Sequence, residues 1–129
     1  MGLLTRDDFK SIEANLKREK VDLDGDNYIF VREMTSGERD TFEGTVLSFD
    51  AKGGIQRETS NYRAKFVCMT ACDEAGALVF TLDDAKWLGK KNVRLVDKLF
   101  FKAKELNNWS IEDVEKNSDP ITGDNSSTT

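Results

Sequence analysis

A short acidic turn between two apolar segments is the feature that most restricts the fold. Residues 21–23 and 28–33 are rich in aliphatic and aromatic side chains, and Asp24-Gly25-Asp26-Asn27 separates them. Asp, Gly and Asn tolerate the left-handed backbone of a tight turn, while β-branched and aromatic residues favour the flanking strands. The pattern predicts a β-hairpin at residues 21–33, so we expect an antiparallel sheet.

Capping boxes predict where helices begin. In such a box a Thr hydroxyl and an acidic side chain three residues later satisfy free backbone N–H groups of the first turn. Thr5 with Asp8 predicts an N-terminal helix, and Thr35 with Glu38 predicts a second helix after the hairpin. We expect the second helix to end in a mobile loop at residues 52–54. Apolar stripes at helical spacing support both helices: Phe9, Ile12 and Leu16 in the first, and Phe42, Val46 and Phe49 in the second.

Two short helices are predicted nearer the C-terminus. Thr81 with Asp84 forms a third capping box, and Gly89 ends the helix that it starts. Ser110 with Asp113 predicts a last turn or two. Acidic side chains in these first turns complement the helix dipole, so we assign the paired carboxylates of this chain no acid–base role.

A longer helix lies between these two. Asn92 is its predicted N-cap, and the helix runs from Val93 to about Leu106. A broad apolar arc of this kind is typical of a helix at the centre of a core. The arc consists of Val93, Leu95, Val96, Leu99, Phe100, Ala103 and Leu106.

Residues 64–80 fit two structures. Tyr62, Phe66 and Met69 keep helical spacing, yet the apolar run at 64–72 also fits a buried strand. Residues 73–76 resemble a hairpin turn that leads into a second apolar segment at 77–80. The turn favours the strand, so we expect a central hairpin here, with the helix as the alternative.

The length of the chain fits one domain with its own core. It has 129 residues, of which 38% are hydrophobic and 33% are charged. We expect an α+β domain with two β-hairpins and about four helices in residues 1–116. Residues 117–129 contain a single apolar side chain among many polar ones, which predicts a disordered C-terminal tail.

The composition excludes several classes of function. The chain has no histidine, which excludes Ser-His-Asp and Cys-His catalysis and His-ligated zinc. A net charge of -5 argues against nucleic-acid binding, which depends on clustered Lys and Arg. No apolar run approaches the roughly 18 residues of a membrane helix. We therefore expect a soluble, intracellular protein, and we assign it no cofactor.

The two cysteines form a poor metal site. Cys68 and Cys72 supply two ligands of four, and no histidine is present to complete the set. In a strand the two would lie about 13 Å apart at roughly 3.3 Å per residue, too far for a disulfide. We expect two small buried thiols that act as hydrophobic residues.

One acidic motif matches part of a calcium-binding loop. Counting from Asp22, carboxylates occupy positions one, three and five, and Glu33 stands at position twelve, where an EF-hand has its bidentate ligand. Asn27 takes the sixth position, which EF-hands give to glycine, and residues 30–32 favour a strand where the exiting helix should begin. A small calcium-binding module at residues 22–33 stays as an alternative to the acidic hairpin turn.

Large aromatic side chains outside the apolar stripes are candidates for a protein interface. At about 100° per residue, Phe101 points away from the arc that contains Phe100. Trp87 lies off the stripe of its short helix, and Trp109 follows the end of the long one. Aromatic residues are favoured interface anchors. Phe100, Phe101, Trp87 and Trp109 are therefore our partner-interface candidates, and burial by neighbouring elements is the alternative.

Residues 21–43 resemble the first part of the tail assembly chaperones of long-tailed bacteriophages and prophages. In that family a segment V-R-E-hydrophobic-T/S-x-x-E-R-D-x-F-E follows a hairpin, as residues 31–43 do here. The resemblance spans about residues 19–117. Further matches follow in the family's order: residues 63–67, Asp73-Glu74-Ala75-Gly76, Phe80, Lys104-Glu105-Leu106-Asn107 and residues 110–115.

The resemblance implies a non-enzymatic assembly factor without catalytic residues. Chaperones of this family bind the long tape measure protein, keep its apolar helical segments soluble, and help recruit the tail tube protein that displaces them. They form homo-oligomers, act in the host bacterial cytoplasm and are absent from the mature virion. A tail completion or head-tail joining protein, which stays in the finished particle, is a further alternative.

Overall fold

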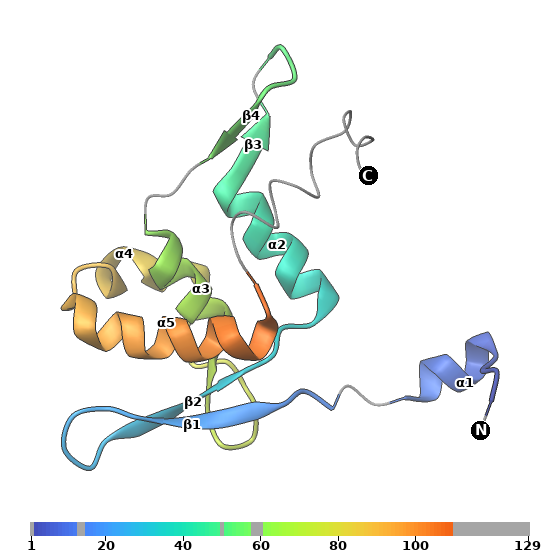
Figure 1. Cartoon of the computed structure of the whole chain (residues 1–129), viewed down its shortest axis with the longest axis horizontal. Helices are drawn as coiled ribbons and strands as arrows, with labels where there is room; N and C mark the ends of the chain where they lie inside the picture. The colour runs from blue at the N-terminus through green and yellow to red at the C-terminus, as the bar shows by residue number, and fades with distance from the viewer. Residues whose placement is uncertain (1, 13–14, 50, 58–60, 110–129) are drawn as a thin grey trace, which may run out of the picture.

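The chain begins with a short helix and a β-hairpin and then continues mostly as helices (Figure 1). The computed structural model describes residues 2–12, 15–49, 51–57 and 61–109. The fold is α+β, as predicted. In chain order its elements are α1 (Arg6–Ser11), β1 (Arg18–Asp22), β2 (Tyr28–Arg32), α2 (Ser36–Val46), β3 (Leu47–Phe49), β4 (Ile55–Arg57), α3 (Tyr62–Thr70), β5 (Ala71–Cys72), the 3-10 helix η1 (Leu82–Asp84), α4 (Ala85–Leu88) and α5 (Val93–Asn107).

The predicted hairpin forms most of a three-stranded antiparallel sheet. β1 pairs with β2 so that Arg18 lies opposite Arg32 and Asp22 lies opposite Tyr28. Gly25 in the connecting turn has a φ of 67°, a left-handed conformation that glycine adopts without steric cost. β5 pairs with the other edge of β2, which gives the strand order β1-β2-β5.

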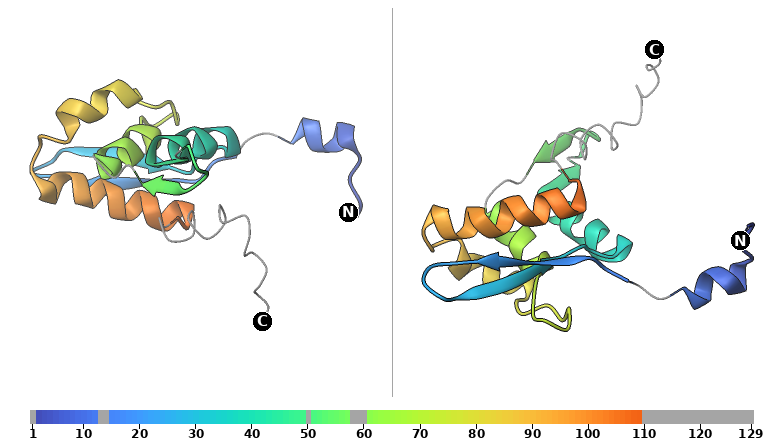
Figure 2. Two further views of the ribbon diagram at one scale, coloured as in Figure 1. Left: turned by 90° about the horizontal axis from the view of Figure 1, so that it is seen from above. Right: turned by 60° about the horizontal axis from the view of Figure 1, so that its bottom comes forward.

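Helices α2 to α5 lie on one face of this sheet (Figures 1 and 2). The segment after β5 turns back at 73–76 and pairs with β5, with Cys72 opposite Leu78. Val21 and Val31 point into the helical side and are buried there. α3 packs between α5 and α4, and it also contacts α2 and the sheet. The core therefore surrounds α3, with Phe42 and Phe66 among its largest fully buried side chains.

The expected strand at residues 64–72 is wrong for most of its length. Residues 62–70 form α3, and strand structure is limited to Ala71–Cys72. Six residues of α3 in the run 64–70 are buried, because neighbours surround this helix on nearly every side. Such a helix needs apolar residues all round, so its sequence looks like a buried strand. The turn after it is confirmed by a hydrogen bond from the Gly76 N–H to the Asp73 carbonyl.

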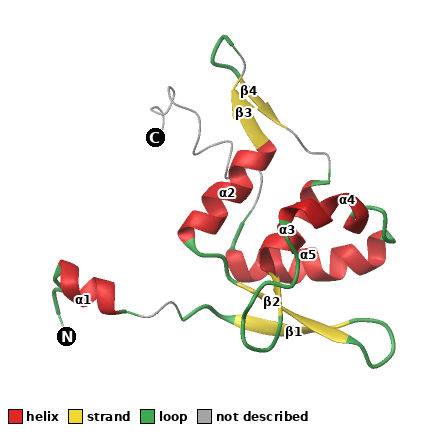
Figure 3. Cartoon of the chain, turned by 180° about the vertical axis from the view of Figure 1, so that it is seen from behind, coloured by secondary structure: helices red, strands yellow, loops and turns green. Residues whose placement is uncertain are grey.

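The turn at residues 73–76 closes a short hairpin, as predicted, because Cys72 pairs with Leu78 and the Val79 N–H donates to the Ala71 carbonyl at 3.1 Å. A further hairpin, which was not predicted, follows α2. α2 ends at Val46, so Phe49 does not continue its apolar stripe and lies in β3 instead. β3 pairs with β4 in a separate two-stranded sheet. This hairpin projects from the end of α2, away from the main sheet (Figure 3). The loop predicted at residues 52–54 connects its two strands.

The predicted helix starts are confirmed. Thr5, Thr35 and Thr81 each form a complete capping box, and the Asn92 side chain accepts the Leu95 N–H at 2.9 Å. α5 ends one residue beyond the predicted Leu106. The turn expected at residues 110–113 and the tail at 117–129 lie outside the described residues.

α1 differs from the other helices because none of its residues is buried. It lies apart from the rest of the chain, beyond the start of β1 (Figure 1). Phe9 and Ile12, predicted as an inward stripe, are exposed, and Leu16 is half-buried. The apolar face of this helix therefore has no partner among the described residues.

Candidate functional site

The structure separates the four candidate aromatic residues into two classes. Phe101 and Trp87 are 52% and 45% exposed, whereas Phe100 and Trp109 are 2% and 3% exposed. Phe100 and Trp109 therefore belong to the core, which is the burial alternative that the sequence left open for these candidates. Contact with a partner stays a prediction for Phe101 and Trp87.

Phe101 lies beside an ion pair that joins α3 to α5. The Arg63 Nη1 donates to Asp97 Oδ1 at 2.6 Å, and this bond raises the pKa of the Arg63 guanidinium. The guanidinium carbon lies 5.8 Å from the ring centroid of Phe101 and 5.5 Å from that of Phe100. An exposed aromatic ring is thus held next to a cation, an arrangement that keeps the ring at the surface.

An open pocket of about 270 Å³ lies next to this ion pair. Arg63 and Asp97 line it together with Tyr62 and Val93, and Val93 is 66% exposed. We call the surface formed by Tyr62, Arg63, Val93, Asp97 and Phe101 the α3–α5 face. It combines exposed apolar groups with a fixed pair of opposite charges, which suits contact with a protein better than catalysis.

Trp87 occupies a different part of the molecule. Its Nε1 donates to the Asp84 carboxylate at 2.9 Å, and its ring meets Phe80 edge to face at 5.7 Å. The backbone N–H of Thr81, followed by the Trp87 indole, lowers the pKa of Asp84. α4 and α5 lie on opposite sides of α3 (Figure 2), so the structure does not combine Trp87 and Phe101 into one surface.

Trp109 anchors the end of α5 in the core. Its ring stacks on Phe66 with centroids 5.0 Å apart and meets Phe42 edge to face at 5.1 Å. Asn108 has a left-handed φ of 49°, and the Trp109 N–H donates to the Lys104 carbonyl at 3.2 Å. This cap turns the chain back over α2 and α3. The Trp109 Nε1 is buried without a hydrogen-bond acceptor in the described part of the chain.

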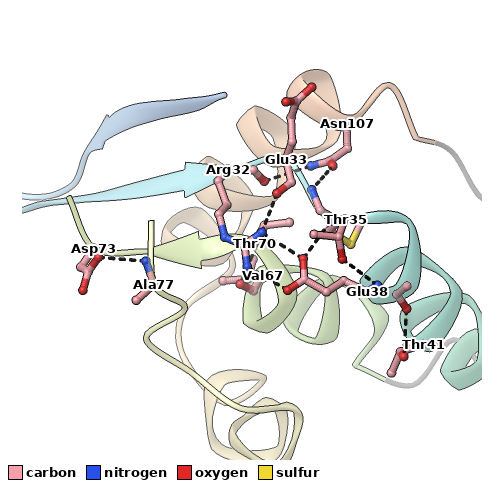
Figure 4. Close-up of polar contacts among 12 residues, drawn as sticks. Arg32, Glu33, Thr35, Glu38, Thr41, Val67, Thr70, Asp73, Ala77 and Asn107 are labelled. Atoms are coloured by element: carbon pink, nitrogen blue, oxygen red, sulfur yellow. Dashed lines mark hydrogen bonds and ion pairs between the residues drawn. The ribbon is translucent and has the colours of Figure 1, made fainter. Parts of the chain in front are cut away.

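A buried polar joint connects the hairpin to α2 (Figure 4). Arg32 is 6% exposed, and its guanidinium donates to both carboxylate oxygens of Glu38 at 2.9 Å. The bond from Arg32 is the main cause that lowers the pKa of Glu38. The same carboxylate accepts the Thr35 N–H at 2.9 Å, so one side chain both caps α2 and pairs with the sheet.

Asn107 ties the end of α5 to the same joint (Figure 4). Its amide oxygen accepts the Met34 N–H at 2.8 Å, and its amide nitrogen donates to the Arg32 and Ala103 carbonyls at 3.2 and 2.8 Å. We did not single out this joint from the sequence. One feature of the sequence could have indicated it: Arg32, Glu38 and Asn107 all lie in segments that carry the family resemblance.

The acidic segment at 22–33 does not form an EF-hand. An EF-hand loop connects two helices, whereas these residues are a turn between paired strands. Glu33 lies beside Lys17, whose N–H donates to its carboxylate at 2.8 Å, at the opposite end of the hairpin from Asp24. The five residues of β2, at roughly 3.3 Å each, separate these ends, so Glu33 cannot close a loop around an ion at the turn. The Asp24 carboxylate pairs with Arg94 instead.

Within the part of the chain that the structure describes, the remaining chemical groups do not converge on a site. Among the residues that the structure describes, no three His, Cys, Asp or Glu side chains are placed to hold one metal ion. Cys68 and Cys72 are buried and free, and burial raises the pKa of Cys68 to about 12. None of the described helices combines the length and apolarity that crossing a membrane requires.

One solved structure has a similar fold. The chain superposes on the tail assembly chaperone of bacteriophage HK97 with a TM-score of 0.56 and 14% sequence identity, over 78% of this chain and 89% of that one. No family model matches the chain. No curated protein matches it by sequence either. The likeness shows that this chain has the fold of that chaperone.

Proposed function

We propose that this protein is a phage tail assembly chaperone. The observation that carries the proposal is the shared fold, which extends over 89% of the HK97 chaperone chain. A second, independent support is the ordered set of sequence motifs that resembles the same family. The first of these motifs builds the joint of Arg32, Glu38 and Thr35, so the resembling residues are those that hold the hairpin to the helices.

The client that we propose is a tape measure protein, whose apolar helical segments the chaperone keeps soluble until the tail tube protein replaces it. The α3–α5 face is our candidate for the contact. An exposed ring such as Phe101 buries large apolar area on binding, while Arg63 and Asp97 beside it keep the free surface soluble. A helix that lays its apolar face on such a surface is a common recognition mode.

The proposal includes a place and a time of action. The protein acts in the host bacterial cytoplasm, has no enzymatic activity and leaves the tail before the virion is complete. The alternative function, a tail completion or head-tail joining protein, would place this protein in the finished virion. Mass spectrometry of purified virions should not detect the chaperone, whereas a stoichiometric amount in the particle would support the rival.

A co-expression pull-down tests client binding. The tagged chain is expressed together with the protein encoded by the long reading frame downstream of its gene, and co-purification of that protein is expected. Phe101→Ser should strongly reduce the recovered client and leave the melting temperature nearly unchanged, since the ring is half exposed. Val79→Ser is the matched control, because Val79 is 44% exposed but lies outside the α3–α5 face. Equal recovery with Phe101→Ser and the control would remove the α3–α5 face from the proposal.

A further inference from the structure

The positive charge of this acidic chain is concentrated around α5. The net charge is -5, yet residues 86–104 contain seven of the 19 Lys and Arg residues and a single acid, Asp97. All seven cations lie in α4, in α5 or in the turn between them. They are Lys86, Lys90, Lys91, Arg94, Lys98, Lys102 and Lys104. A local field of one sign attracts partners of the opposite sign, so the net charge of the whole chain does not describe this part of the molecule.

The Phe101 ring has cations on two sides. At about 100° per residue, Lys98 and Lys104 lie about 60° to either side of Phe101 around α5. The Lys104 Nζ lies 6.0 Å from the centroid of the adjoining Phe100 ring, and the Arg63 guanidinium carbon lies 5.8 Å from that of Phe101. Lys98 is exposed. A ring between two rows of positive charge matches an apolar stripe with acidic side chains along both edges.

Two acids also stand beside the ring, and both are held by cations. Asp97 pairs with Arg63 at 2.6 Å, and Glu105 pairs with Lys102 at 3.4 Å. The two flanking lysines form no ion pair within the described part of the chain, so the charge that they offer to a partner is positive. The fixed acids disfavour a nucleic acid, because a phosphate backbone carries negative charge along its whole length and would meet them.

The basic surface has limits at the hairpin. Arg94 pairs with Asp24 of the acidic turn at residues 24–27, at 3.2 Å. Lys102 pairs with Glu19 of β1 at 3.2 Å, on the side of the sheet. The surplus of positive charge therefore lies along the rest of the exposed side of α5 and toward α3.

The pocket next to Arg63 supplies a second anchor point. Its volume of about 270 Å³ is just below the roughly 300–1,000 Å³ typical of small-molecule sites, and it suits one side chain. Tyr62 and the exposed Val93 are apolar lining residues, and Lys91 adds a further cation. Val93 precedes Phe101 by eight residues, or about 12 Å at roughly 1.5 Å per residue. Apolar side chains about two turns apart on a partner helix would reach both points.

We propose that the α3–α5 face, together with Lys91, Lys98 and Lys104, binds a client helix whose apolar stripe has Asp and Glu residues along both edges. The stripe covers Phe101 and enters the pocket, and the acids pair with the lysines. A helix with the same stripe but basic edges is disfavoured, because like charges would face each other across the contact. This inference rests on the proposed function, since the face is our candidate for client contact, and it adds the charge pattern of the client segment.

Two model peptides test the charge pattern without the natural client. Both are helices of about 20 residues with the same leucine stripe, and one has Glu and the other Lys along the edges. Fluorescence anisotropy measures their binding to the full chain. The Glu peptide should bind at least about tenfold more tightly, because three lysines attract it and repel the other, and each exposed ion pair contributes up to a few-fold. Its dissociation constant should rise with added salt. Equal affinities for the two peptides would overturn the inference.

Charge reversal at one lysine makes the test specific for this face. Lys98→Glu should weaken binding of the Glu peptide and strengthen binding of the Lys peptide, so the ratio of the two affinities should fall at least about threefold. The substituted carboxylate lies four residues from both Arg94 and Lys102, so the helix should keep its stability, and an unchanged melting temperature checks this. Lys10→Glu is the matched control, with the same change in net charge on α1, which lies apart from the face (Figure 1). Equal effects of the two substitutions would contradict the inference, since only net charge would then matter.

The same assay identifies other occupants of the face. A single-stranded DNA of about 20 nucleotides that binds more tightly than the Glu peptide would overturn the inference in favour of a nucleic acid. Self-association of the wild type that Lys98→Glu abolishes would also overturn it, because a second copy would then cover the face.

The inference and the proposed function fail in different ways. A tape measure protein that co-purifies equally with the wild type and with Lys98→Glu, while both peptides bind equally, would overturn the charge pattern and leave the proposed function intact. A chain that prefers the Glu peptide and loses this preference in Lys98→Glu, but co-purifies with no tape measure protein, would support the charge pattern and contradict the proposed client.

Discussion

The two tryptophans provide a direct test of the core, because they have the same side chain in opposite surroundings. Trp109 is 3% exposed and packs against Phe42 and Phe66, while Trp87 is 45% exposed on α4. Truncating a buried Trp to Ala costs about 3–5 kcal/mol, from lost burial and the cavity left behind. Total stabilities of such domains are about 5–15 kcal/mol. Trp109→Ala should therefore remove at least about a fifth of the free energy of unfolding, and most of it if the domain lies at the low end of that range.

Trp87→Ala should cost much less. About half of that ring is already in water, and the hydrogen bond that it loses, to Asp84, lies at the surface. We expect a loss of about 1 kcal/mol, typical of an exposed neutral hydrogen bond plus partial burial. Trp109→Phe should also be mild, about 1–2 kcal/mol, because the Trp109 Nε1 has no acceptor among the described residues and the stacked ring is kept.

Urea unfolding followed by far-UV circular dichroism measures all three variants. For a domain of this size the loss in Trp109→Ala corresponds to a fall in melting temperature of about 10–20 °C. The fluorescence of Trp87→Ala should be blue-shifted relative to the wild type, because the remaining tryptophan is the buried one. A cost below about 1 kcal/mol for Trp109→Ala, or equal costs for the two Ala variants, would refute the placement of Trp109 in the core.

Three further predictions concern the polar joint and the thiols. The bond from Arg32 holds the pKa of Glu38 below its ordinary 4.5. The ion pair therefore stabilises the fold fully above pH 4.5, and this stabilisation is lost as the pH falls through the lowered pKa. Glu38→Gln should cost about 2–3 kcal/mol at pH 7, and its difference in stability from the wild type, measured by urea titration, should shrink in acid. A difference that is independent of pH would contradict the role of the ion pair. Asn107→Ala should cost about 1–3 kcal/mol in the same assay, because a part-buried backbone N–H loses its acceptor, and an unchanged midpoint would count against the joint. Burial raises the pKa of both Cys68 and Cys72. Both thiols should therefore react with a thiol reagent at least about 100-fold more slowly in the native protein than in urea. Fast labelling of the folded protein would show that they are accessible.

Local signals in the sequence predicted the elements that depend on local interactions. The turn at residues 24–27 and the three capping boxes act over three to four residues, so the hairpin and the starts of α1, α2 and η1 could be placed before the structure was known. The periodicity of α5 was equally readable, because this helix has one buried face. Val93 is the exception within its predicted arc, since it is 66% exposed at the start of the helix.

The wrong predictions concern residues whose secondary structure or burial depends on tertiary packing. α3 is surrounded by other elements, so its residues carry no amphipathic period that separates a helix from a strand. Trp109 is buried because the left-handed Asn108 directs it over α2 and α3, which spacing along the chain does not reveal. The joint of Arg32 and Glu38 combines residues six apart on a strand and a helix, a distance at which no local rule applies.

The solubility of a tape measure protein tests the central claim most directly. The protein encoded by the downstream long reading frame is expressed alone, with this chain, or with an unrelated soluble protein of similar size, and the soluble fraction is measured after centrifugation. We predict that the client is mostly insoluble alone and with the unrelated protein, and mostly soluble and bound to this chain when both are present. A soluble fraction that is the same with and without this chain, and no complex between the two, would contradict the account.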